Sequence, residues 1–130
     1  MGKSLETTTA RATKILLLGD NISKNKSLLE KLGEKHLVVV SNGEKPFKNN
    51  IEKHSYDLIV LELNEPVSEP LATLKTIKQQ QPAQKVIVIS DGHSVKVVAK
   101  AFNYGAADFF RTPVNISLLN ERIDALVHTA

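Results

Sequence analysis

Polar residues follow four short apolar runs of the sequence, at the points where the runs end. The four segments are Gly19-Asp20-Asn21, Glu62-Leu63-Asn64, Ser90-Asp91 and Arg111-Thr112. Carboxylate oxygens are ligands for hard cations such as Mg²⁺, so Asp20 and Glu62 together could bind a divalent ion weakly. The alternative is that the two carboxylates merely face water.

Other familiar chemistries lack the residues they need. The chain has no cysteine, which excludes disulfides, thiolate zinc sites, iron–sulfur clusters and a cysteine nucleophile. Gly19 stands alone after the first run, whereas phosphate-binding loops have clustered glycines. The histidines are too dispersed for a local metal motif or a serine triad, so we interpret them as surface or loop residues. They are His36, His54, His93 and His128.

The composition indicates one globular domain. The 130 residues, of which 42% are hydrophobic, suffice for one core and are too few for two. The net charge of +3 comes from dispersed lysines and arginines, so we expect no direct nucleic-acid partner. No apolar stretch approaches the roughly 18 residues of a membrane span, and we expect a cytoplasmic protein with no membrane partner. We expect residues 1–12 to form a flexible leader and residues 13–130 to form the domain.

The apolar runs predict a parallel sheet. They are rich in β-branched residues and leucine, and they recur at intervals too long for hairpins, at residues 15–18, 37–40, 58–61 and 86–89, with a weaker run at 108–110. Continuous hydrophobicity is typical of strands that are covered on both faces. Helical patterns fill the intervals, at residues 22–32, around 47–51, at 71–77, and after the capping residues Ser94 and Asn115.

Five repeats of a strand followed by a helix predict a doubly wound, three-layer α/β/α sandwich. In the helix after Ser94, the apolar residues that recur at helical spacing are Val95, Val98, Ala99 and Phe102. Sites in such folds lie at the carboxyl ends of the strands. The polar segments described above occupy those ends.

Six segments resemble, in order and spacing, the receiver domain of bacterial two-component response regulators. They are KILLLGDN, SNGEKPF, YDLIVLELNEP, KVIVIS, YGAADFF and RTPVNISLLNERI. The resemblance covers the chain from Lys14 to Val127. It implies a CheY-like, flavodoxin-like sheet of five strands in the order 2-1-3-4-5. It also implies a role in signal transduction, in a phosphorelay or a transcription regulator.

The resemblance also implies a set of site residues. In a working receiver, an acidic pair after the first strand and an aspartate ending the third bind Mg²⁺, and that aspartate accepts a phosphoryl group from a histidine kinase. A hydroxyl residue after the fourth strand and a lysine after the fifth contact the phosphoryl oxygens. In the same order, these positions fall on Gly19 with Asp20, Glu62, Ser90 and Thr112.

Three of these positions depart from the pattern. Loss of a carboxylate at Gly19 weakens Mg²⁺ binding. The longer Glu62 side chain moves its carboxylate roughly 1.5 Å from the expected place, which is large for in-line attack. Thr112 cannot supply the cation that offsets phosphoryl charge, and Arg111 points to the opposite face of the strand. We therefore interpret the chain as a pseudo-receiver that is not an enzyme and needs no cofactor, although Asp20 with Glu62 could retain weak Mg²⁺ binding.

Two interpretations stay open for Glu62 and for the switch residues. Glu62 is either a built-in mimic of the phosphorylated state or part of a decayed site, satisfied by water or by Ser90. Ser90 and Phe109 either move together as a switch, or Phe109 is ordinary core. The resemblance further implies a cis peptide before Pro113, and prolines predict a stiff loop over residues 64–70.

The leading hypothesis is a regulatory domain that signals through protein contacts without phosphorylation. The resemblance implies an output face over residues 94–127, which forms homodimers or docks an output domain. Its charged pairing candidates are Lys96, Lys100, Arg122 and Asp124. One alternative is a residually competent receiver that is phosphorylated on Glu62 or another acceptor. Another is a small-ligand sensor that uses an emptied pocket near Gly19 and Thr112.

Overall fold

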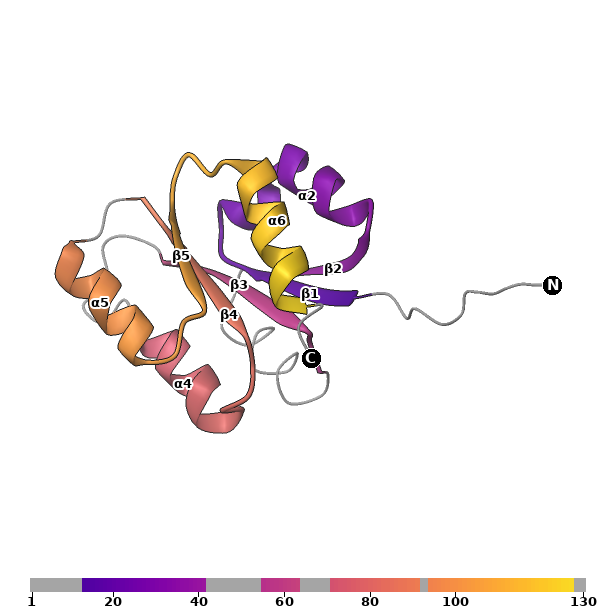
Figure 1. The fold of residues 1–130 in the computed structure, drawn as a ribbon. Coiled ribbons are helices and arrows are strands. Elements are labelled where there is room, and N and C mark those ends of the chain that lie inside the picture. The colour runs from indigo at the N-terminus through magenta and orange to yellow at the C-terminus, as the bar shows by residue number, and fades with distance from the viewer. Residues whose placement is uncertain (1–12, 42–54, 64–70, 92–93, 128–130) are drawn as a thin grey trace.

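The fold is a parallel sheet between two layers of helices (Figure 1). The computed structural model describes residues 13–41, 55–63, 71–91 and 94–127. The strands of this part are β1 (Thr13–Leu18), β2 (His36–Ser41), β3 (Leu58–Leu63), β4 (Val86–Ser90) and β5 (Asp108–Arg111). Its helices are the 3-10 helix η1 (Ile22–Lys24) and the α-helices α2 (Lys26–Gly33), α4 (Ala72–Gln80), α5 (Val95–Asn103) and α6 (Ile116–Val127). No helix among these residues is long and apolar enough to cross a membrane.

The strand order β2-β1-β3-β4-β5, with every pair parallel, confirms the predicted sheet. Successive side chains of a strand point to opposite faces, so each apolar run serves two cores. Leu16 of β1 packs in a cluster with residues of α4 and α5, whereas its neighbour Ile15 packs in a cluster with residues of α2 and α6. Figure 1 shows these two helix pairs on opposite faces of the sheet, which confirms the three-layer prediction.

Polar side chains set where the helices begin. The predicted helix over residues 22–32 is interrupted, because Asn25 has an extended backbone (φ −80°, ψ 98°) and separates η1 from α2. The Asn25 side chain accepts a hydrogen bond from the Leu28 N–H (3.1 Å) and so caps α2. Ser94 and Asn115 cap α5 and α6 in the same way, as predicted. The predicted leader over residues 1–12, the helix around 47–51 and the loop over 64–70 lie outside the described residues.

The apolar face predicted for α5 is not the face that packs on the sheet. Ala101 is fully buried, and Val97 packs beside it, whereas Val95 is 80% exposed and Phe102 is 46% exposed. The sequence of α5 contains two overlapping apolar stripes, and only contact with the sheet selects between them. The stripe with the larger side chains is left facing outward.

The strand β2 is less covered than its apolar run predicts. Leu37 and Val40 are about half exposed, because β2 lies at one edge of the sheet that the described residues form. His36 at the start of β2 was predicted at the surface or in a loop, and this is wrong: its side chain is 2% exposed. The predictions for His54, His93 and His128 concern residues outside the described part of the chain.

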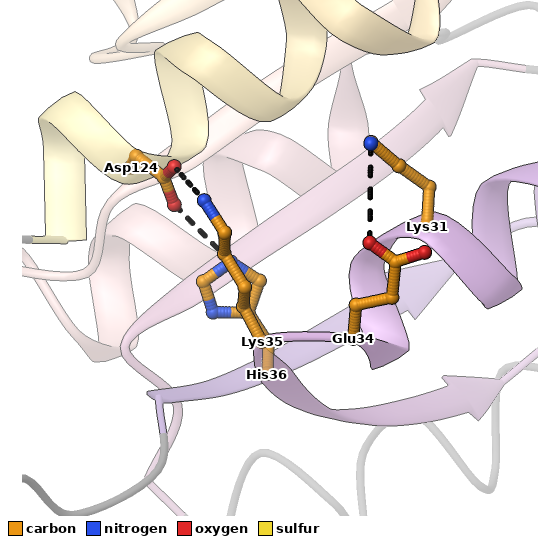
Figure 2. Close-up of polar contacts among 5 residues, drawn as sticks. All are labelled: Lys31, Glu34, Lys35, His36 and Asp124. Carbon is orange, nitrogen blue, oxygen red and sulfur yellow. Dashed lines mark hydrogen bonds and ion pairs between the residues drawn. The ribbon is translucent and has the colours of Figure 1, made fainter.

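The burial of His36 is explained by α6 (Figure 2). Asp124 of α6 lies over the start of β2, with Oδ1 3.4 Å from Nε2 of His36 and Oδ2 3.2 Å from Nζ of Lys35. One carboxylate therefore contacts two basic side chains next to each other in the sequence, and it ties the last helix to the edge strand. Lys31 and Glu34 form a more exposed pair on α2, at 3.9 Å.

We predict that Asp124→Asn lowers the free energy of unfolding by about 1 kcal/mol, because the neutral amide weakens contacts to a buried imidazole and to an ammonium group. Glu34→Gln is the matched control, since its exposed ion pair should contribute less than about 0.5 kcal/mol. Urea unfolding of both variants measures the difference. Equal effects of the two substitutions would show that Asp124 does not tie α6 to β2.

Candidate functional site

The register of the sheet brings the polar strand ends to one edge. Glu62 of β3 pairs with Ile89 of β4, and Leu63 pairs with Ser90. Ser90 in turn pairs with Arg111 of β5, and its carbonyl accepts a hydrogen bond from the Thr112 N–H (3.0 Å). On the other side of β3, the last residue of β1 pairs with Leu61, so the turn after β1 lies beside Glu62.

Glu62 binds the turn that follows β1. Its Oε1 accepts hydrogen bonds from the backbone N–H groups of Asn21 (2.9 Å) and Ile22 (3.0 Å). Its Oε2 accepts a hydrogen bond from Nδ2 of Asn21 (2.9 Å). These donors lie where η1 begins, and the first N–H groups of a helix have no partner within the helix. The Glu62 carboxylate therefore acts as a cap for a helix that lies 40 residues away in the sequence.

Gly19 is packed directly against this side chain. Its φ is +150°, and its N–H donates to the Ser41 carbonyl (2.9 Å). A Cβ at position 19 would lie 2.4 Å from Cβ of Glu62 and 2.5 Å from its Oε1, distances that real side chains do not reach. Glu62 therefore fills the room next to Gly19, which the small-ligand interpretation assigns to an anion or a metabolite.

The residues around Glu62 do not fit a divalent cation. Asp20 is exposed, and among the described residues its carboxylate has no hydrogen-bond or ion-pair partner. The Glu62 oxygens face three N–H donors, whose positive ends would oppose a cation at the same place. The described part of the chain contains no group of three or more His, Asp or Glu residues that could hold a metal ion. We therefore derive no chemical step through Mg²⁺.

The remaining predicted site residues differ in exposure. Ser90 is fully buried, whereas Thr112 is exposed. The peptide between Thr112 and Pro113 is cis, as the resemblance implies. Phe109 is partly buried and packs against the core cluster of α4 and α5. Coupled movement of Ser90 and Phe109 stays a prediction.

An open groove of about 570 Å³ lies on the opposite side of β5 from β4. Helices α5 and α6 form its walls, and Phe109, Phe110 and Arg111 of β5 contribute to its lining. The exposed apolar side chains of Val95, Phe102 and Leu118 line it as well. The groove thus lies within the predicted output face.

The charged candidates of that face are arranged differently from the prediction. Arg122 donates from Nε to Oδ2 of Asp108 (2.7 Å) at the groove. Asp124 points to the other side of α6, where it contacts Lys35, so its prediction as a pairing residue of the output face is wrong. Lys96 and Lys100 are exposed on α5.

Sequence reasoning missed the donors that hold Glu62. Asn21 was included only as the end of a strand segment, and Ile22 only as an apolar helix residue. A glycine, two residues before the expected start of a helix, was the available signal, since it allows a side chain from another strand to approach. The partner could not be identified because 41 residues separate Asn21 from Glu62.

We predict that Gly19→Ala destabilises the domain by about 2 kcal/mol, because the new methyl group collides with Glu62 and the backbone is in a region that favours glycine. The cost should be smaller in a Glu62→Gly background, where the colliding atoms are absent. Thermal or urea unfolding of the four proteins of this cycle measures the coupling.

Gly33→Ala is the matched control for this experiment, because no atom lies within 4 Å of a Cβ at position 33. Helix propensity predicts that this substitution is neutral or stabilising by up to about 1 kcal/mol. The packing of Gly19 on Glu62 is refuted if Gly19→Ala costs the same in both backgrounds.

Comparison with known proteins gives the same family from several sides. The chain is 28% identical over 118 residues to the transcriptional regulatory protein ZraR of Escherichia coli (strain K12), covering 88% of this chain and 26% of ZraR. It is 35% identical over 74 residues to the response regulator ArlR of Staphylococcus aureus (strain Mu50), covering 57% of this chain and 33% of ArlR. The chain thus spans only about a quarter to a third of these relatives.

A solved structure shares the fold. The receiver domain protein (CheY-like) from Methanospirillum hungatei JF-1 superimposes with a TM-score of 0.80 at 22% identity, covering 90% of this chain and 94% of that one. Residues 19–124 match the family model of the response regulator receiver domain. With the strand order and the polar edge described above, this match shows that the chain belongs to the receiver domain family of two-component response regulators.

Proposed function

We propose that this receiver domain signals through protein contacts without phosphorylation of residue 62, and that it is not an enzyme. The observation that carries the proposal is the state of the Glu62 carboxylate. Three N–H groups of Asn21 and Ile22 already donate to it, so its oxygens are directed at the turn after β1. An acceptor in this position would have to give up those hydrogen bonds before it could attack a phosphorus atom.

The electrostatics of the site support the same proposal. Phosphoryl transfer depends on cations that offset the charge on the transferring group. The exposed Thr112 carries no charge, and the donor set beside Glu62 does not fit a divalent ion. Because these contributions act on one transition state, their joint loss lowers the rate of transfer by more than any single loss.

The proposal assigns the output to the face formed by α5, β5 and α6. Its groove carries large apolar side chains that the fold leaves exposed, which is typical of a surface that binds another protein. We propose that this face contacts a partner protein or an output domain. The greater lengths of ZraR and ArlR are compatible with such a domain in a longer regulator.

The test is incubation of the purified chain with acetyl phosphate and Mg²⁺, followed by intact-mass spectrometry. We expect no gain of about 80 Da, the mass of one phosphoryl group. A phosphorylatable receiver such as that of ZraR, treated in parallel, controls for the donor. A stoichiometric gain on this chain, on Glu62 or on any other residue, would instead support a residually competent receiver.

A variant with the chemistry of the family pattern provides the converse experiment. We predict that Glu62→Asp combined with Thr112→Lys gains a measurable phosphoryl adduct under the same conditions. The shorter carboxylate withdraws from the turn, and the lysine supplies the missing cation. The single variant Thr112→Lys is the control, because Glu62 keeps its hydrogen bonds to the turn in that protein.

A further inference from the structure

The groove between α5, β5 and α6 has features that restrict what it can bind. We propose that it binds a short, acidic, amphipathic helix of a partner protein. The inference rests on the proposed function, in which this face provides the output, and it specifies the chemistry of the partner.

The walls of the groove favour apolar side chains spaced as on a helix. Val95 and Phe102 lie two turns apart on α5, and Leu118 lies on α6; all three line the groove and are between 46% and 80% exposed. Helix α5 has nine residues, which corresponds to a length of about 13 Å. A partner helix of two to three turns therefore matches the wall, and it would place residues at i, i+3, i+4 and i+7 against it.

Addition of a strand to the edge of β5 is disfavoured. The Phe109 N–H donates to Oδ1 of Asp108 (2.8 Å), and Oδ2 of the same carboxylate accepts from Nε of Arg122 on α6 (2.7 Å). The Asp108 side chain thus occupies a backbone donor that a new strand needs, and it joins the edge to α6. Docking must then use side chains, as a helix does.

The charges of the groove select an acidic partner. Its lining contains two arginines, Arg111 and Arg122, and one acid, Asp108, which is bonded to Arg122. Helix α5 adds Lys96 and Lys100 and has no acidic residue. Carboxylates on a partner helix would be attracted to this surface.

The same charges disfavour a second copy of the chain. A symmetric dimer places the same surface on both sides of the interface, so the excess of positive charge would meet itself. A separate, acidic partner avoids this repulsion.

The experiment selects ligands with the unmodified chain as bait, from a displayed library of random helical peptides of about 14 residues. Val95→Glu is the counter-selection bait, since this side chain is 80% exposed and its substitution should leave the fold intact. We expect enriched peptides with net negative charge and apolar residues at helical spacing. Neutral or basic peptides, enrichment independent of Val95, or no enrichment at all would overturn the proposal.

An enriched peptide then gives quantitative tests by fluorescence anisotropy. We expect Val95→Glu to weaken binding at least about tenfold, whereas Leu37→Glu, an exposed apolar residue on β2, should change it less than about twofold. Replacing the acidic residues of the peptide by lysine should abolish binding, and Arg111→Glu should partly restore it. Binding that ignores these charge reversals contradicts the proposed chemistry, and so does a chain dimer that Val95→Glu disrupts.

Measuring the peptide before and after treatment with acetyl phosphate separates the two proposals. Binding by the untreated chain supports both. Binding that requires a phosphoryl adduct overturns the proposed function but keeps the acidic helix as the ligand. Absence of binding in both states, with no adduct, overturns the acidic helix alone.

Discussion

The hydrogen bonds from Asn21 and Ile22 to the Glu62 carboxylate organise the carboxyl edge of the sheet. They join the turn after β1 to the end of β3, and they satisfy donors that η1 leaves without a partner. The contact needs Gly19, because only a residue without a side chain allows Glu62 to pass so close. Two positions that differ from the family pattern are therefore parts of one packing arrangement.

This arrangement separates two regions that a strand connects. Thr112 follows β5 at the edge where Glu62 lies, whereas Phe109 and Arg111 of β5 line the groove between α5 and α6. The groove is thus built on the scaffold that carries the site. In the proposed account, an anchored carboxylate holds the edge in one state, and the exposed apolar side chains of α5 and α6 act as a standing surface for a partner.

The fold was predictable because its signals are local. Continuous apolar runs indicated the parallel strands, and Ser94 and Asn115 indicated the starts of two helices. The errors concern contacts between distant residues. The buried position of His36 depends on Asp124, 88 residues later, and the outward face of α5 depends on which stripe meets the sheet. For the same reason, the sequence indicated that Glu62 is unusual but not which groups hold it.

The most direct test of the central contact is a pH titration followed by NMR. The resonances to record are the side-chain carboxyl carbon of Glu62 and the backbone amides of Asn21 and Ile22. A carboxylate that accepts hydrogen bonds from two amides must pass its own titration on to them, since protonation weakens both bonds. The account predicts that both amide resonances shift with the same midpoint as the Glu62 carboxyl carbon. Amides that stay unchanged while Glu62 titrates would contradict it.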